Sequence, residues 1–203
     1  MQAFESVSTW RQPAPPPASR TRAAVTGAVA RRIAQLSPGR LRVAVDGLTG
    51  AGKTSFGHEL AAALRALDRP TMRASLDDFK YPWRHAREHG YDRVSGEGYY
   101  RSAYDFGSAR DLLLSPAGPG GSGMVALCGH DPLTGEDHRD TRISAPPDAI
   151  LIVSPWPSAC APRRMLGVGS AGGVPGPGAG SPVLPHRMGL VVQFAGLAPS
   201  SRR

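Results

Sequence analysis

Residues 47–54 read GLTGAGKT, and this spacing of glycine, lysine and threonine is typical of a loop that binds phosphate groups. Glycines let the backbone wrap closely around an anion, and the loop N–H groups add partial positive charge. Lys53 is expected to reach the β- and γ-phosphates of a nucleotide, and the Thr54 hydroxyl to bind Mg²⁺. The predicted nucleotide-binding residues are Gly47, Gly50, Ala51, Gly52, Lys53, Thr54 and Ser55.

Two adjacent acids, Asp77 and Asp78, follow a predicted strand over residues 71–76. A carboxylate beside a phosphate loop can accept a proton from a substrate hydroxyl or hold Mg²⁺, and it can equally cap a helix. Neighbouring side chains of an extended segment point to opposite sides, so we predict that Asp77 faces the loop and Asp78 does not. Asp46, directly before the loop, is expected to close the turn into it.

Two histidines, His130 and His138, flank a turn that contains Asp-Pro and Thr-Gly. The turn predicts a hairpin, and three interpretations of the histidines remain open: an exposed tip, contacts with a substrate, or a metal site. No third ligand at a suitable spacing supports the metal.

The segments around the loop have the patterns needed to position it. Residues 41–46 predict a buried strand, and residues 55–67 predict a helix with one apolar face. The apolar residues of this face are Phe56, Leu60, Leu64 and Leu67. A second helix is predicted over residues 22–36, with Val25, Val29, Ile33 and Leu36 at helical spacing.

The rest of the chain alternates between strand and helix patterns. Strands are predicted over residues 71–76, 124–128, 141–144 and 149–153, a helix over 108–114, and short helices and loops over 80–106. The alternation predicts an α/β fold of the P-loop NTPase type, a doubly wound and mostly parallel sheet with helices on both faces. Its domain would span residues 21–153.

The two ends of the chain differ from this body. Residues 1–20 are proline-rich without hydrophobic periodicity, and residues 154–203 hold nine glycines, eight prolines and no acid. Both are predicted to be disordered or irregular, which leaves the C-terminal part of the fold incomplete. Residues 1–40 carry six arginines against one acid and residues 154–203 carry five arginines, whereas residues 41–153 carry 13 basic and 15 acidic side chains.

This charge distribution excludes some classes of function. The near-neutral body argues against nucleic-acid binding, because the basic residues lie in the ends. Cys128 and Cys160 are too few for a disulfide framework or a metal quartet. Without a signal pattern or an apolar run of membrane-spanning length, we expect a cytoplasmic protein with no membrane partner.

Five segments, in this order, resemble the uridine kinase and phosphoribulokinase-like group of P-loop kinases. They are GLTGAGKT, ASLDDFKYPW, YYRSAYDFGSARDLLL, HDPLTGEDHRD and DAILIV, and the likeness covers residues 41–153. The resemblance implies ATP- or GTP-dependent, Mg²⁺-assisted phosphoryl transfer to a hydroxyl of a nucleoside or similar small molecule.

The resemblance also implies roles for individual residues. Asp77 takes the position of the general base on the nucleoside 5′-hydroxyl, close to the metal that Thr54 binds. Tyr104 and Asp105 resemble the segment whose acid binds the ribose. His138 and Arg139 resemble the part of the hairpin that packs on the base, although the turn here is longer.

The chain departs from the family after residue 153. The family has an acid near Mg²⁺ there and then an arginine-rich lid, whereas this chain continues with Ser154-Pro155-Trp156 and has one basic pair, Arg163-Arg164. Such a change is typical of a reading-frame shift or of a divergent tail. The alternative function is therefore a non-catalytic, nucleotide-binding remnant. A P-loop GTPase would need an Asn-Lys-x-Asp segment, which the sequence lacks.

Overall fold

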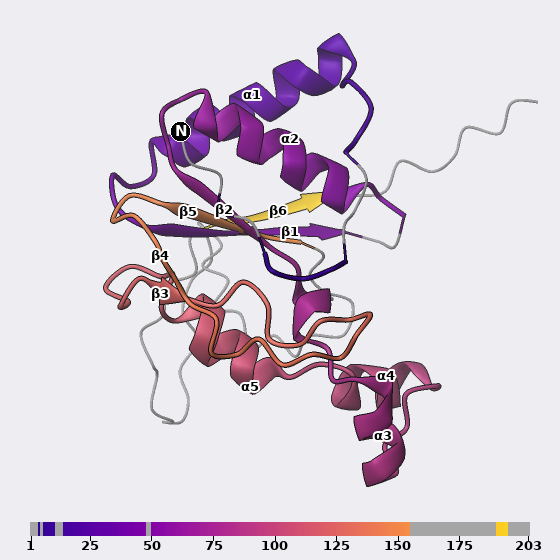
Figure 1. The fold of residues 1–203 in the computed structure, drawn as a ribbon. Coiled ribbons are helices and arrows are strands. Elements are labelled where there is room, and N and C mark those ends of the chain that lie inside the picture. The colour runs from indigo at the N-terminus through magenta and orange to yellow at the C-terminus, as the bar shows by residue number, and fades with distance from the viewer. Residues whose placement is uncertain (1–3, 5, 11–13, 48–49, 155–189, 195–203) are drawn as a thin grey trace, which may run out of the picture.

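A four-stranded parallel sheet forms the centre of the protein in a computed structural model that describes residues 4, 6–10, 14–47, 50–154 and 190–194. The strands lie in the order β2-β5-β1-β6, as Figure 1 shows. Their bounds are Leu41–Gly47 for β1, Thr71–Ala74 for β2, Ile150–Val153 for β5 and Leu190–Phe194 for β6.

The strand order places the phosphate loop at the switch point of the sheet. β5 pairs with β1 on one side, with Leu41 opposite Ile150, and with β2 on the other, with Thr71 opposite Ile150. β6 pairs on the opposite side of β1. The order therefore reverses at β1, and ligands of such sheets bind at the carboxyl end of the strands at this point. The predicted parallel arrangement is confirmed.

Two helices cover one face of the sheet, α1 (Arg20–Ala34) and α2 (Lys53–Arg65). They bury the odd-numbered apolar residues of β1 and the even-numbered ones of β5 in a single cluster. Its members are Ala30, Ile33, Leu41, Val43, Val45, Phe56, Leu60, Ala61, Leu64, Ile150 and Ile152. The alternation along the strands sends their other side chains to the opposite face.

The apolar face predicted for α1 is confirmed in its middle, where Ile33 is buried and Val29 packs against the cluster. Val25 is 51% exposed, and the buried residues are Thr26, Ala30 and Ile33. Two predicted members of helix faces, Leu36 and Leu67, are also exposed. Both lie beyond the ends of their helices, whose C-caps are Gln35 and Ala66, so helical spacing no longer directs them to the core.

The second face is covered by smaller elements. α5 (Phe106–Ser108) runs into the π-helix η2 (Ala109–Leu114), and β3 (Met124–Val125) pairs antiparallel with β4 (Ile143–Ser144). Their buried residues pack on Leu151 and Val153 of β5 and on Met72 and Ala74 of β2. Helical structure therefore lies on both faces, as predicted, but β3 and β4 form a separate two-stranded sheet.

Residues 76–102 form short helices beyond the carboxyl ends of the strands (Figure 1). They are the 3-10 helix η1 (Leu76–Phe79), α3 (Trp83–His89) and α4 (Gly96–Ser102). This arrangement confirms the short helices predicted over residues 80–106. In the part of the chain that the structure describes, no helix has the length and apolar character needed to cross a membrane.

The two ends of the chain contribute more than the sequence predicted. Phe4 pairs with Met72 at the edge of β2, and the buried Ser8 belongs to a segment that was expected to be disordered. Residues 190–194, within the predicted irregular tail, form β6 beside β1. Residues 155–189 and 195–203 lie outside the described residues, as do Arg163-Arg164 and Cys160.

Candidate functional site

The phosphate loop joins the carboxyl end of β1 to the N-terminus of α2. Gly50 and Gly52 both have φ of 79°, a left-handed conformation that favours glycine, and Gly52 is the N-cap of α2. Lys53 and Thr54 therefore occupy the first turn of the helix, and Ser55 follows them. Backbone N–H groups and the helix dipole point toward any anion placed here.

Two side chains brace the start of the loop. The buried Asp46 carboxylate accepts a hydrogen bond of 2.6 Å from the Gly47 N–H, which confirms its predicted role in closing the turn. Lys53 Nζ donates to the Gly47 carbonyl at 2.8 Å, so its ammonium group extends across the loop. This hydrogen bond keeps the ammonium group beside the backbone of the loop.

Asp77 and Asp78 lie on the 3-10 helix η1, not on the extended segment that was predicted. The N-cap Ser75 accepts a hydrogen bond from the Asp77 N–H, and this tight turn replaces the alternation of an extended chain. The reasoning that assigned the two acids to opposite sides was therefore wrong. Asp77 is half-buried and Asp78 is buried, so of the two only Asp77 is accessible to a ligand.

Asp77 pairs with Lys80, whose Nζ lies 2.6 Å from Oδ1. The same ammonium group lies 5.1 Å from the ring centre of Tyr104 and 5.5 Å from that of Tyr99. Burial acts to lower the pKa of Lys80, but hydrogen bonds with Asp77 and Tyr99 outweigh it and raise the pKa. Lys80 therefore stays charged and holds the Asp77 carboxylate in place.

Asp78 is enclosed by the N-terminal segment, residues 6–10. Ser6 Oγ donates to its Oδ2 at 3.5 Å, and Ser8 also hydrogen-bonds the carboxyl group. Its other oxygen, Oδ1, is buried without a hydrogen-bond partner among the described residues. Burial is the main reason that the pKa of Asp78 rises to about 7, and the neighbouring Asp77 adds to the shift.

The backbone of Asp78 also connects η1 to the hairpin of residues 129–138. Its carbonyl accepts the N–H groups of Gly129 and His130 at 2.8 and 3.0 Å. At the hairpin turn, Asp131 accepts hydrogen bonds from Leu133 and Thr134 and from the backbone and hydroxyl of Thr9. The N-terminal segment therefore contacts both η1, through Asp78, and the hairpin, through Asp131.

Asp105, a predicted site residue, is the N-cap of α5. Its carboxylate accepts from the Ser108 N–H at 2.9 Å and from the Ser108 hydroxyl at 2.6 Å, which caps α5. Tyr81 also hydrogen-bonds this carboxylate, and burial together with Asp105 raises the pKa of Tyr81. The negative charge of Asp105 also acts to raise the pKa values of His130 and Arg139. The structure thus brings two predicted residues, Asp105 and Arg139, into one neighbourhood.

The hairpin predicted from its turn residues is confirmed, with His130 opposite Asp137. His130 is buried, and burial is the main cause that lowers its pKa. His138 Nε2 lies 3.8 Å from Glu136. Among the described residues, no group of three or more histidine, cysteine, aspartate or glutamate side chains is placed to hold a metal ion. Sequence reasoning assigned no role to Tyr81, although it lies within the segment ASLDDFKYPW that follows the second predicted strand.

Position 154, directly after β5, is occupied by a buried serine. Ser154 Oγ accepts a hydrogen bond of 2.8 Å from Arg73 Nη2, and Gly57 of α2 packs against both groups. Burial, together with the nearby Arg65, lowers the pKa of Arg73 to about 10. At this end of β5 the described structure therefore presents a hydroxyl and a guanidinium.

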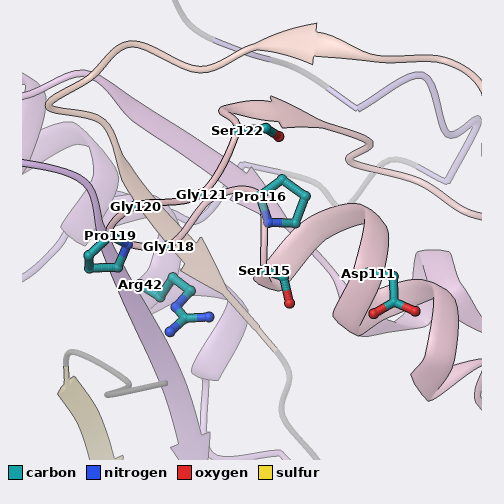
Figure 2. Close-up of a pocket in the computed structure, with 9 residues that line it drawn as sticks. All are labelled: Arg42, Asp111, Ser115, Pro116, Gly118, Pro119, Gly120, Gly121 and Ser122. Atoms are coloured by element: carbon teal, nitrogen blue, oxygen red, sulfur yellow. The ribbon is translucent and has the colours of Figure 1, made fainter. Parts of the chain in front are cut away.

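A separate pocket of ≈ 350 Å³ lies near the opposite end of β1 (Figure 2). Arg42, the second residue of β1, lies beside the glycine-rich turn of residues 118–122, and its Nη1 donates to the Leu114 carbonyl at 2.9 Å. Burial lowers the pKa of Arg42. Because β1 ends at the phosphate loop and begins near this pocket, the two sites are distinct.

Comparisons with known proteins find likeness in structure. No protein-family profile matches the chain, and no curated protein matches its sequence. A solved structure described as a possible uridine kinase from Bacillus stearothermophilus is 21% identical, with a TM-score of 0.49, and the match covers 66% of this chain and 70% of that one. A candidate fructose transport system kinase from a Silicibacter species is 24% identical, with a TM-score of 0.43, over 67% of this chain and 64% of its own.

Proposed function

We propose that the protein is a phosphotransferase that moves the γ-phosphoryl group of ATP or GTP to a hydroxyl of a nucleoside or similar small molecule. The observation that carries the proposal is the loop between β1 and α2. It lies at the switch point of the sheet, with two glycines in the left-handed conformation and Lys53 extended over it. Such a loop binds the phosphate chain of a nucleotide.

The donor groups near the loop suit Mg²⁺, which prefers oxygen ligands. The Thr54 hydroxyl, in the first turn of α2, would bind the ion, and Asp77 would contact it through water. When bound, Mg²⁺ would neutralise charge on the phosphates. The chain's own contribution is positioning: the loop amides and Lys53 would orient the phosphate chain.

Asp77 is the residue that would accept the proton of the acceptor hydroxyl. Lys80 fixes its carboxylate at 2.6 Å, and Asp105 with Tyr81 offers hydrogen-bonding groups for the rest of the acceptor. A positioned carboxylate of this kind contributes about 10²- to 10⁴-fold to a reaction rate.

The test is direct turnover with ATP and a panel of nucleosides and sugars. The Asp77→Asn variant should bind ATP as tightly as the parent and lose about 10²-fold or more in turnover. ATP binding without turnover of any hydroxyl compound would contradict the proposed transfer.

One observation favours the second candidate, a nucleotide-binding protein without catalysis. Ser154 and Arg73 stand where a carboxylate would support the metal, so Mg²⁺ would lack a negative partner at the end of β5. This loss would act on the transition state, where metal and positioning supply most of the rate. Replacing Ser154 by Asp distinguishes the candidates: a gain in turnover would indicate a kinase site short of one acid.

A further inference from the structure

Arg22, in the first turn of α1, lies beside the phosphate loop although its helix precedes β1. The terminal nitrogens of its guanidinium, Nη2 and Nη1, lie 3.9 and 4.0 Å from the point that a Cβ on Gly52 would occupy. Gly52 caps α2 and directly precedes Lys53. The guanidinium therefore lies close to the end of the loop from which the helix N–H groups emerge.

The Arg22 guanidinium is positioned through its Nε by Glu59. Its Nε donates to Glu59 Oε2 of α2 at 2.8 Å, and the Glu59 side chain is largely buried. Across the described ranges of the chain, neither terminal nitrogen of Arg22 has a hydrogen-bond partner. The Arg22 side chain is 42% exposed, so a solute bound at the loop could reach these two nitrogens.

The charges around this point favour an anion. α1 and α2 both begin at the end of the sheet where β1 ends (Figure 1), and neither helix has an acidic residue in its first turn. Their N-termini therefore add partial positive charge to that of Lys53 and Arg22. Glu59 offsets only part of this charge, and it lies further along α2 than Lys53.

We propose that Arg22 is a second cation of the nucleotide site, and that its terminal nitrogens bind the phosphate chain of a nucleoside di- or triphosphate. This inference rests on the proposed nucleotide site. A guanidinium suits the task because its planar set of N–H groups can donate two parallel hydrogen bonds to phosphate oxygens, which an ammonium group cannot. Glu59 would orient the guanidinium through Nε and leave the two terminal nitrogens available to phosphate oxygens.

The experiment measures ATP and ADP affinity by calorimetry for Arg22→Gln and Arg22→Lys. We expect Arg22→Gln to weaken both affinities about five-fold or more, and Arg22→Lys to keep part of them. Arg32→Gln is the matched control, because it removes one exposed arginine from the last turn of the same helix. Thermal unfolding of each variant measures the separate loss of the contact between α1 and α2.

Equal ATP affinity in Arg22→Gln and Arg32→Gln would overturn the inference and leave Arg22 as a tie between two helices. If ATP affinity falls in Lys53→Ala but not in Arg22→Gln, the proposed nucleotide site stands and only the role of Arg22 fails. Conversely, ATP binding that depends on Arg22, without turnover of any hydroxyl compound, would support the inference and contradict the proposed transfer reaction.

Discussion

The two halves of the proposed site, one for the phosphates of a nucleotide and one for the acceptor, are built in different ways. The first comes from one continuous segment, β1, the loop and α2, and its helix buries Phe56, Leu60 and Leu64 against the sheet. The second is assembled from η1, Tyr81, the start of α5 and the hairpin, and hydrogen bonds from Gly129 and His130 to the Asp78 carbonyl join two of these parts that are far apart in sequence.

The difference shows which half can adapt. The backbone conformation of the phosphate loop is set by its glycines and by helix α2, so few substitutions preserve it. The acceptor half depends on side chains such as Lys80, Asp105 and Asp131, each making several polar contacts. Changes there would alter the choice of acceptor and leave nucleotide binding intact.

The chain's two lysines give the largest test of this separation. Lys53→Ala removes the cation over the loop and should weaken ATP binding more than ten-fold, because charge-assisted bonds to phosphate are lost. Lys80→Ala breaks the pair with Asp77 and should leave ATP affinity within about two-fold. Calorimetry on both variants makes the comparison. Equal losses would show that the two halves do not act separately.

The Asp78 carboxyl group supplies a test of the acceptor half by pH. Its pKa is raised to about 7, so the folded protein keeps a proton that the unfolded chain releases near its ordinary value of 3.8. Stability from this group is therefore present at low pH and falls as the pH rises from about 4 to 7. Asp78→Asn stays neutral and should be more stable than the parent by up to about 4 kcal/mol at pH 8, because the pKa is displaced by about 3 units.

Urea unfolding of the parent and of Asp78→Asn, at about pH 4.5 and at about pH 8, would check this expectation. The advantage of the Asn variant should shrink toward zero at the lower pH. A stability difference that is equal at the two pH values would mean that Asp78 ionises normally in the fold.

The smallest test compares two helix caps. Ser19 accepts the Arg22 N–H at the start of α1, and Ser95 accepts the Gly98 N–H at the start of α4. Replacing either by Ala should cost about 1 kcal/mol locally. In α1, which packs on α2, the cost should appear in global unfolding. In the short α4 it should appear as faster amide exchange of that helix alone, and a fall in global stability with Ser95→Ala would contradict this.

Features that depend on a few neighbouring residues could be predicted from the sequence. The loop motif, the strand over residues 41–46 and the hairpin turn were all recognised, because glycine positions, β-branched runs and turn residues act over a few neighbours. The 3-10 turn at Asp77 and Asp78 was missed, because Ser75 caps it through one hydrogen bond that gives no periodic signal. The contact of Arg22 with the loop depends on how α1 packs on α2, and no spacing within the sequence records that packing.

Pairing of β5 between β1 and β2 also determines when the sheet can form during synthesis. Leu41 pairs with Ile150, so the first strand must wait for a partner made roughly 110 residues later. At a synthesis rate of about 5–20 residues per second, this delay is on the order of ten seconds. Throughout it, the backbone edge of β1 lacks its partner strand, and the apolar side chains of β1 lack their neighbours Ile150 and Ile152. We therefore expect β1 to be unpaired on the β5 side while most of the described chain is being synthesised.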